Sequence, residues 1–274
     1  MVKKRKSKIK SKLPKKSNTK KIILLVLALV ISIFFIIPLL FGLFNGSKVG
    51  NVALISVNGV IMGGDGGGSF GQSIASSKTI VGFLEDAEKR ATVKAVLLEI
   101  NSPGGGAVAS DEIATQIKTM KKPVVSVIRE VGASGGYWIA SATDHIIANR
   151  MSITGSIGVI SSYLEFSGLM EEYGVGYERL VAGKYKDVGS PFKKLDVNEK
   201  KLLQGKLDKI HTFFINEIAA NRKLSESEVK KLATGEFFLG VEAYNLGLVD
   251  ELGNKKSAEN YLKKKVGLKE INYA

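Results

Sequence analysis

The chain is 274 residues long, carries a formal net charge of +14 and contains no cysteine, which excludes a thiol nucleophile, a thiolate zinc site and disulfide bonds. Of its 40 Lys and Arg residues, eleven lie within residues 1–21, and the rest of the chain has 29 basic against 26 acidic residues. Because the positive charge gathers in one tail rather than on a folded face, the composition argues against a nucleic-acid-binding domain, and no nucleic acid partner is expected.

Residues 22–44 form an apolar run that directly follows the basic tail and is interrupted only by Ser32, Pro38 and Gly42. As a helix this run would span about 34 Å, more than the roughly 30 Å hydrocarbon core of a bilayer. It is longer than the core of a signal peptide and no convincing cleavage site follows, so we expect an uncleaved transmembrane helix. The charges before it predict a single-pass protein of the cell membrane, with residues 1–21 cytoplasmic and the rest outside, after a short linker at 45–50.

Residues 51–274 are expected to form one domain in which buried strands alternate with helices. Apolar, β-branched runs predict strands at 52–61, 94–100, 123–128, 145–148, 158–161 and 177–186. Helical spacing predicts helices at 79–90, at 109–120 with Ser110 as the cap, from the turn 132–136 to about residue 142, at 163–173, and through most of the chain after Asp196. This alternation indicates an α/β domain with a mostly parallel sheet.

The segment Gly-Ala-Ser-Gly-Gly at residues 132–136 is predicted to turn from a strand into a helix. A serine between small residues at a helix start is open to close approach by a substrate, and the free N–H groups of the helix lie where an oxyanion would form. The segment also fits G-x-S-x-G, the nucleophile-elbow pattern of α/β-hydrolases. The alternative interpretation is a tight turn in which Ser134 only caps a packed helix.

A serine nucleophile needs a base, and the chain contains two histidines. The order Ser134, Asp187, His211 fits an elbow-type triad. However, His211 falls inside a helical pattern and His145 inside an apolar strand, so we expect both histidines to be structural. With so few histidines and no cysteine, no metal site is expected either.

Lysine is the other available base, and Lys184 and Lys186 share one face of the predicted strand 177–186. To act as a base near pH 7, a lysine must have its pKa lowered by roughly 3 units from about 10.4, which burial in an apolar site can achieve. The alternative is a pair of solvated strand lysines.

Two glycine-rich segments complete the candidates. Residues 101–106, Asn-Ser-Pro-Gly-Gly-Gly, follow a predicted strand, and their amides could complete an oxyanion hole, although alone they are merely a turn. Residues 66–71 fit G-x-G-x-x-G but neither open a clear helix nor carry a lysine for phosphate, so we interpret residues 63–71 as a loop and expect no dinucleotide or other cofactor.

Five motifs occur together in a characteristic order. They are Ser-Pro-Gly-Gly at 102–105, Ala-Ser-Gly-Gly-Tyr-Trp at 133–138, Thr-Gly-Ser-Ile-Gly-Val at 154–159, Gly-Lys-Tyr-Lys-Asp at 183–187 and Gly-Val-Glu-Ala-Tyr-Asn-Leu-Gly-Leu-Val-Asp at 240–250. With these motifs the chain resembles the signal peptide peptidase A family, membrane-anchored S49 serine peptidases with a ClpP/crotonase-like fold. The resemblance covers about residues 52–253 and a single copy of the domain, as in the short form of the family.

The resemblance assigns roles to individual residues. Ser134 matches the nucleophile, Lys186 the general base, and Ser156 the residue that orients this lysine, while Lys184 stays an alternative. The amide of Gly104 or Gly105, with that of Gly135, matches the oxyanion donors. ClpP peptidases place a histidine roughly 25 residues after the serine, and residues 155–160 contain none, which favours a Ser–Lys dyad.

The resemblance further implies a homo-oligomeric ring in which adjacent protomers contribute Ser and Lys, with hydrophobic peptides in or near the lipid bilayer as substrates. The leading hypothesis is therefore a peptidase that degrades cleaved signal peptides or other membrane-embedded segments. One alternative is a related Ser–Lys peptidase that cuts a stomatin-like partner or acts in membrane protein quality control. An alternative of another class is a non-catalytic crotonase-like scaffold.

Overall fold

The computed structural model describes residues 19–37, 50–64 and 73–274, which fall into two compact units, Met1–Lys48 and Val49–Ala274. In the first unit, helix α1 (Thr19–Ile31) continues into a π-helical turn, η1 (Ser32–Ile36). Nowhere in the described ranges is there a helix with the length and apolarity needed to span a bilayer. Of the predicted transmembrane segment 22–44, residues 38–44 lie outside the described residues, as do most of the basic tail and of the linker.

The second unit is built on a mostly parallel sheet with the order β1-β4-β5-β6-β9, as predicted from the alternating strands and helices. Strand β7 adds to β5 in parallel, and β8 pairs with β7 in the antiparallel sense. A separate parallel pair joins β2 and β3. The strands are β1 (Val52–Asn58), β2 (Val60–Met62), β3 (Ile74–Ser76), β4 (Ala95–Ser102), β5 (Val124–Ala133), β6 (His145–Ala148), β7 (Ile153–Gly155), β8 (Phe237–Leu239) and β9 (Glu251–Leu252).

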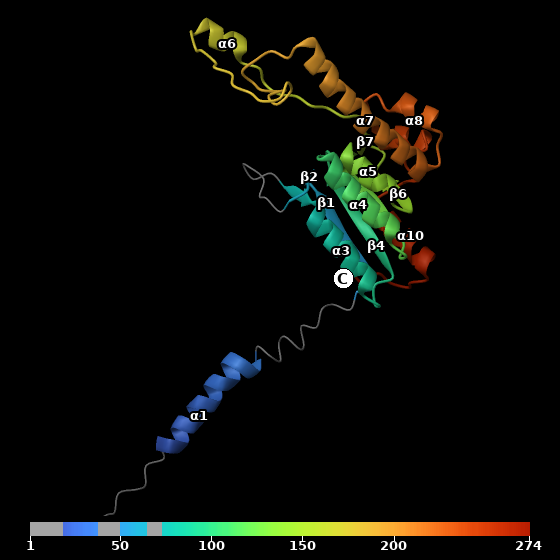
Figure 1. The fold of residues 1–274 in the computed structure, drawn as a ribbon. Coiled ribbons are helices and arrows are strands. Elements are labelled where there is room, and N and C mark those ends of the chain that lie inside the picture. The colour runs from blue at the N-terminus through green and yellow to red at the C-terminus, as the bar shows by residue number, and fades with distance from the viewer. Residues whose placement is uncertain (1–18, 38–49, 65–72) are drawn as a thin grey trace, which may run out of the picture. The chain divides into compact units, whose positions relative to one another are not determined.

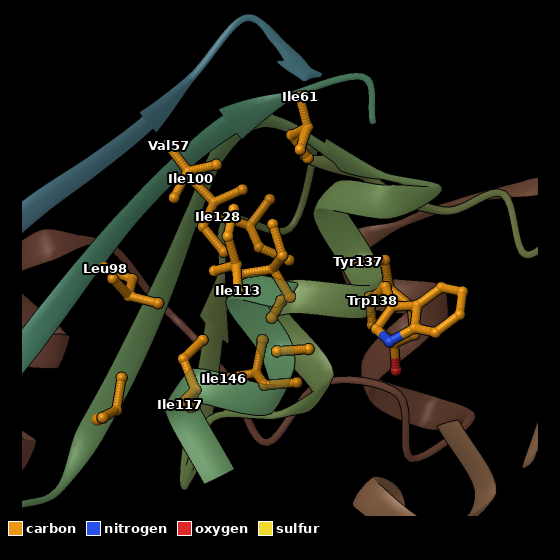
Figure 2. Packing of buried hydrophobic residues seen from close by; sticks show 14 of the residues in the cluster. Val57, Ile61, Leu98, Ile100, Ile113, Ile117, Ile128, Tyr137, Trp138 and Ile146 are labelled. Atoms are coloured by element: carbon orange, nitrogen blue, oxygen red, sulfur yellow. The ribbon is translucent and has the colours of Figure 1, made fainter. Parts of the chain in front are cut away.

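Helices cover both faces of this sheet, which explains why its central strands are continuous apolar runs rather than alternating ones. In β4 the neighbours Leu97 and Leu98 are both fully buried, one in each of two hydrophobic clusters. Figure 2 shows Ile113 and Ile117 of α4 among the side chains of the larger cluster. The helices of this unit are α3 (Ser77–Lys89), α4 (Ala107–Thr119), α5 (Gly135–Ser141), α6 (Ser167–Glu172), α7 (Val197–Arg222), α8 (Glu226–Leu232), α9 (Gly240–Asn245) and α10 (Lys255–Val266).

Several predicted elements differ from the structure. The predicted strands 158–161 and 177–186 are irregular chain, and the predicted helix 163–173 shortens to α6. Helix α4 begins at Ala107 after Gly106, so the prediction that Ser110 caps it is wrong. Ser110 instead lies in the first turn of the helix, where its hydroxyl donates to the carbonyl of Gly106, the residue before the helix, at 3.0 Å.

Residues 160–196, which we call the arm, contain no buried residue. In Figure 1 the arm carries α6 away from the sheet before the chain returns along α7. The contacts that the arm makes lie mostly within itself, such as the amide of Phe166 on the carbonyl of Pro191 at 2.7 Å and the ring of Tyr177 on that of Phe192. The arm therefore leaves several large apolar side chains exposed within one copy of the described chain.

Candidate active site

Ser134 lies between the carboxyl end of β5 and the first residue of α5, as the sequence predicts. Its backbone has φ 52° and ψ −123°, a conformation that residues other than glycine rarely adopt. Two hydrogen bonds hold it there: its N–H donates to the carbonyl of Gly155 in β7 at 2.8 Å, and its carbonyl accepts from the N–H of Trp138 at 2.9 Å. Such a sharp turn projects the serine side chain away from the strand, as in a nucleophile elbow.

Helix α5 is anchored in the core, and this packing holds Ser134 in place. The buried Tyr137 donates its hydroxyl to the carbonyl of Leu248 at 2.8 Å, and the ring of Trp138 stacks on Phe214 of α7 at 4.6 Å between centroids. Figure 2 shows Tyr137 and Trp138 side by side where α5 meets the core. The helix behind the serine is therefore held by packing and by a buried hydrogen bond.

The turn after β4 packs directly against the serine turn. A Cβ atom added to Gly104 would lie 2.8 Å from both the Ser134 Cβ and the Gly135 amide nitrogen, so only glycine allows this approach. The Gly104 N–H already donates to the Ser102 hydroxyl at 3.1 Å. The N–H groups of Gly105 and Gly135 donate to no acceptor among the described residues, and a Cβ on Gly135 would lie 3.3 Å from the Gly105 nitrogen. Between the alternatives Gly104 and Gly105, this geometry favours Gly105 as the oxyanion donor beside Gly135.

Ser156 lies beside Ser134 because β7 runs alongside the end of β5, with Gly155 paired to Ala133. Its backbone also has a positive φ, 50°, and its N–H donates to the carbonyl of Glu236 at 2.8 Å. The Ser156 hydroxyl donates to the carbonyl of Gly235 at 3.3 Å. A hydroxyl that donates its one hydrogen keeps its lone pairs free, so Ser156 can accept a hydrogen bond from an ammonium group in the cleft.

Ser134, Ser156, Gly105 and Gly135 all line one cleft of about 520 Å³. Apolar side chains form much of its remaining wall, and they come from α5, from the chain after β7 and from α7. They are Trp138, Val159, Ile160, Leu207, Ile210 and Phe214. A polar end beside an apolar wall is typical of sites that bind apolar ligands in one orientation.

Neither Lys184 nor Lys186 lines this cleft; both lie exposed in the arm. The segment that carries them is a turn, in which the Lys186 amide donates to the carbonyl of Gly183 at 3.1 Å. Next to them the Arg179 guanidinium makes two hydrogen bonds to the Asp187 carboxylate, which hold the pKa of Asp187 at about 2, below its ordinary value of 3.8. The structure of one chain therefore does not bring Lys186 to Ser134, and Asp187 is bound to a cation of the arm.

The two histidines lie elsewhere. His145 is paired with Val125 at the beginning of β5, about 30 Å along the strand from Ser134, and its ring stacks on Tyr261. His211 lies in α7, but it is absent from the lining of the cleft, and its buried Nε2 has no hydrogen-bond partner among the described residues. The geometry therefore gives no support to a Ser134–Asp187–His211 triad. In the part of the chain that the structure describes, no group of three or more His, Asp or Glu side chains could hold a metal ion.

Sequence reasoning missed two parts of this site. Leu207, Ile210 and Phe214 lie in the stretch after Asp196 that is predicted only as helix, and nothing in their spacing shows that they line the cleft. The second part is the loop at Gly235, which holds Ser156 from 79 residues further along the chain. No local pattern in the sequence indicates such a contact.

Comparison with known proteins identifies the chain over most of its length. The profile of peptidase family S49 matches residues 116–269, a range that contains Ser134, Ser156 and Lys186. A putative protease of Methanocaldococcus jannaschii is 37% identical over 219 residues, 79% of this chain and 70% of that protein.

Two further relatives carry more specific names. A putative signal peptide peptidase SppA of Enterococcus faecium is 36% identical over 80% of this chain and 65% of its own length. A chloroplastic serine protease, SPPA, of Arabidopsis thaliana is 30% identical over 81% of this chain, which spans only 34% of that larger protein. The chain therefore belongs to peptidase family S49, in the group of signal peptide peptidase A, and is a serine peptidase.

Proposed function

We propose that the protein is a membrane-anchored endopeptidase that cuts hydrophobic peptides, cleaved signal peptides among them, with a Ser134–Lys186 dyad completed between neighbouring copies. The observation that carries this proposal is the composition of the cleft: it holds a strained serine, two free amides and a hydroxyl acceptor, and no base is present among its described lining residues. An S49 peptidase with this cleft needs a general base that comes from outside the cleft, and Lys186 is a solvent-exposed lysine of the arm.

The exposed surface of the arm supports an assembly of several copies. Leu180 is 96% exposed, Ile160 89% and Tyr173 74%. Large apolar side chains exposed to this extent on one segment are typical of surfaces that another protein covers. A head-to-tail contact, repeated around a closed ring, would lay each arm on the next copy and bring its Lys186 to the Ser134 of that neighbour.

The dyad would then act as follows. The neutral Lys186 amine removes the proton of the Ser134 hydroxyl, whose oxygen attacks the peptide carbonyl carbon while the amides of Gly105 and Gly135 hold the oxyanion. The Lys186 ammonium protonates the leaving amine as the C–N bond breaks. A water molecule, deprotonated by the same lysine, then hydrolyses the ester and restores Ser134. Ser156 positions the lysine because its hydroxyl oxygen accepts a hydrogen bond from one of the lysine N–H groups.

The apolar wall of the cleft supports the choice of substrate, because the half-buried Leu207 and Ile210 of α7 present apolar surface to a peptide side chain. The predicted transmembrane helix at 22–44, with its N-terminus in the cytoplasm, would keep this cleft on the outer side of the cell membrane. Signal peptides left in that membrane after cleavage are apolar and short, which suits an open cleft with an apolar wall.

Labelling of the full chain with a fluorophosphonate probe tests the dyad. We expect the wild type to be labelled, Ser134→Ala to be unlabelled, and Lys186→Ala to lose at least about 100-fold in labelling rate, the scale of a lost general base. Lys184→Ala is the matched control because it removes a lysine two residues away, and it should keep most of the rate. Full labelling of Lys186→Ala would refute the dyad, and a loss confined to Lys184→Ala would assign the base to that residue instead.

Cleavage of apolar peptides tests the substrate class. A synthetic signal peptide should be cut faster than a polar peptide of the same length, and Leu207→Ser, at a half-buried position, should reduce this preference by making the wall polar. Capture of one folded membrane protein by the Ser134→Ala variant, without any cleavage of signal peptides by the wild type, would point to a dedicated protein substrate instead.

A further inference from the structure

The edge of the sheet opposite Ser134 is where the chain enters the second unit. Strand β5 separates this edge from the serine by ten residues, or about 33 Å. The first residues of the unit are tied to its last ones: the Asn51 N–H donates to the carbonyl of Asn272 at 2.8 Å, and the Asn51 side chain donates to the carbonyl of Glu270 at 2.9 Å. In Figure 1 the C-terminus lies at this edge, away from α5 and α7.

Basic side chains gather around this point from three segments. Helix α10 runs from Lys255, which pairs with Glu99 in the second half of β4, back to this edge, where it ends in three consecutive lysines. The loop before β4 joins them, since the Lys94 N–H donates to the carbonyl of Asn51 at 2.8 Å, and the loop before β5 contacts the end of α3. We call this set the basic edge: Lys89, Arg90, Lys94, Lys121, Lys263, Lys264, Lys265 and Lys269.

Few acidic groups oppose this charge. Asp86, Glu88, Asp144 and Glu270 lie in the same segments, and the carboxylate of Glu88 accepts from two backbone amides of the loop before β5. Lys89 is paired with Glu85. Lys264, Lys265 and Lys269, by contrast, are exposed, and within the described ranges no carboxylate forms an ion pair with them. Three unpaired lysines therefore dominate the end of α10 and the segment that follows.

We propose that the basic edge lies on the anionic phospholipid headgroups of the membrane that anchors the protein. The proposal rests on the membrane anchor of the proposed function. Only five residues separate the end of the predicted span at residue 44 from Gly50, so the chain reaches at most about 20 Å from the bilayer to this edge. An anionic surface attracts each nearby lysine, but the attraction fades within a Debye length of about 8 Å in physiological salt. The charges that can contribute are therefore those at the tethered edge.

This contact would orient the unit as well as hold it. With the basic edge on the headgroups, the cleft at Ser134 opens about 30 Å above the lipid surface rather than against it. The substrate would then be a peptide that has left the bilayer at least in part.

A fluorescent probe on the full chain tests this orientation, and the absence of cysteine allows single-site labelling. Thr92→Cys places the probe at an exposed, uncharged position between Arg90 and Lys94, and Met151→Cys places it at the opposite edge. Each labelled protein is reconstituted in vesicles of phosphatidylcholine, alone or mixed equally with phosphatidylglycerol, that contain a headgroup-attached nitroxide quencher. We expect stronger quenching of the Thr92→Cys probe when phosphatidylglycerol is present, and no such change for Met151→Cys.

Charge removal then tests the lysines. The triple variant Lys264→Gln, Lys265→Gln, Lys269→Gln should lose most of the phosphatidylglycerol-dependent quenching, since each lysine contributes about fivefold to the attraction. The matched variant Lys206→Gln, Lys230→Gln, Lys231→Gln, with its changes in α7 and α8, should keep the phosphatidylglycerol-dependent quenching. Salt raised towards 1 M, where the screening length falls to about 3 Å, should abolish the effect in every variant.

A failure of the basic-edge proposal can be distinguished from a failure of the proposed function. Flotation of the same protein with phosphatidylcholine vesicles reports the anchor, and fluorophosphonate labelling reports the dyad. A protein that floats and is labelled, but whose Thr92→Cys probe is quenched equally with and without phosphatidylglycerol, overturns the basic edge alone. A protein that does not float overturns both the anchor and this proposal.

Discussion

The backbone of Ser134 should store strain that glycine releases. At φ 52° and ψ −123° a side chain costs of order 1–3 kcal/mol, whereas glycine adopts this region without penalty. Glycine also increases the conformational entropy of the unfolded chain, which lowers the free energy of unfolding by about 0.4–1 kcal/mol and opposes the gain from released strain. With the middle of each range, we expect Ser134→Gly to be more stable than Ser134→Ala by about 1.3 kcal/mol. For a unit of this size that corresponds to a melting temperature higher by roughly 3–5 °C.

Both variants lack the serine hydroxyl, so the comparison between them isolates the effect of backbone strain on stability. The assay is thermal unfolding of the full chain in detergent micelles, followed by circular dichroism. The matched control is Ala133→Gly, one residue earlier in β5, where the backbone is extended and the side chain buried. This substitution should lower the melting temperature. If Ser134→Gly is no more stable than Ser134→Ala, the serine turn is not strained and the elbow geometry is wrong.

Three further predictions follow from the same contacts. Gly135→Ala should cost about 1–3 kcal/mol of stability, because its Cβ would lie 2.2 Å from the Ser110 hydroxyl, and adding Ser110→Ala should recover most of the loss in a thermal melt. Pairing with Arg179 lowers the folded-state pKa of Asp187 to about 2, so this carboxylate stabilises the arm above about pH 4, and the stabilisation should vanish as the pH falls through 2. Hydrogen exchange of residues 177–193, corrected for the pH dependence of the intrinsic rates, should show this loss of protection in the wild type but not in Asp187→Asn. His211→Ala should keep fluorophosphonate labelling, whereas loss of labelling in a folded variant would revive the triad.

The sequence predicted the elements whose signals are local. The apolar runs of the central strands and the glycine-rich turn around Ser134 need only neighbouring residues to be recognised, and the structure confirms a mostly parallel α/β unit with the serine between strand and helix. The end of β5 was missed because its last three residues become strand through long-range pairing: all three pair with β7, which follows 20 residues later, and Gly132 also pairs with Ser102 of β4.

The predicted strand 177–186 shows the opposite error. Its residues have the composition of a strand, but a strand needs a partner for its backbone hydrogen bonds, and the described part of one chain offers none there. Ser156 shows a similar limit, since its position depends on the carbonyls of Gly235 and Glu236, far along the chain. Long-range contacts and contacts between copies are the information that a local pattern lacks.

The central claim is that Ser134 and Lys186 of different copies form one active site, and mixing two inactive variants tests it most directly. Ser134→Ala and Lys186→Ala are each inactive in this account, but each keeps the group that the other lacks. After the two are dissociated, mixed equally and reassembled, a site that draws its serine and its lysine from different copies should be complete about one time in four. Peptide cleavage should therefore recover to about a quarter of the wild-type rate. No recovery at any mixing ratio, in mixtures shown to exchange copies, would contradict a dyad shared between protomers.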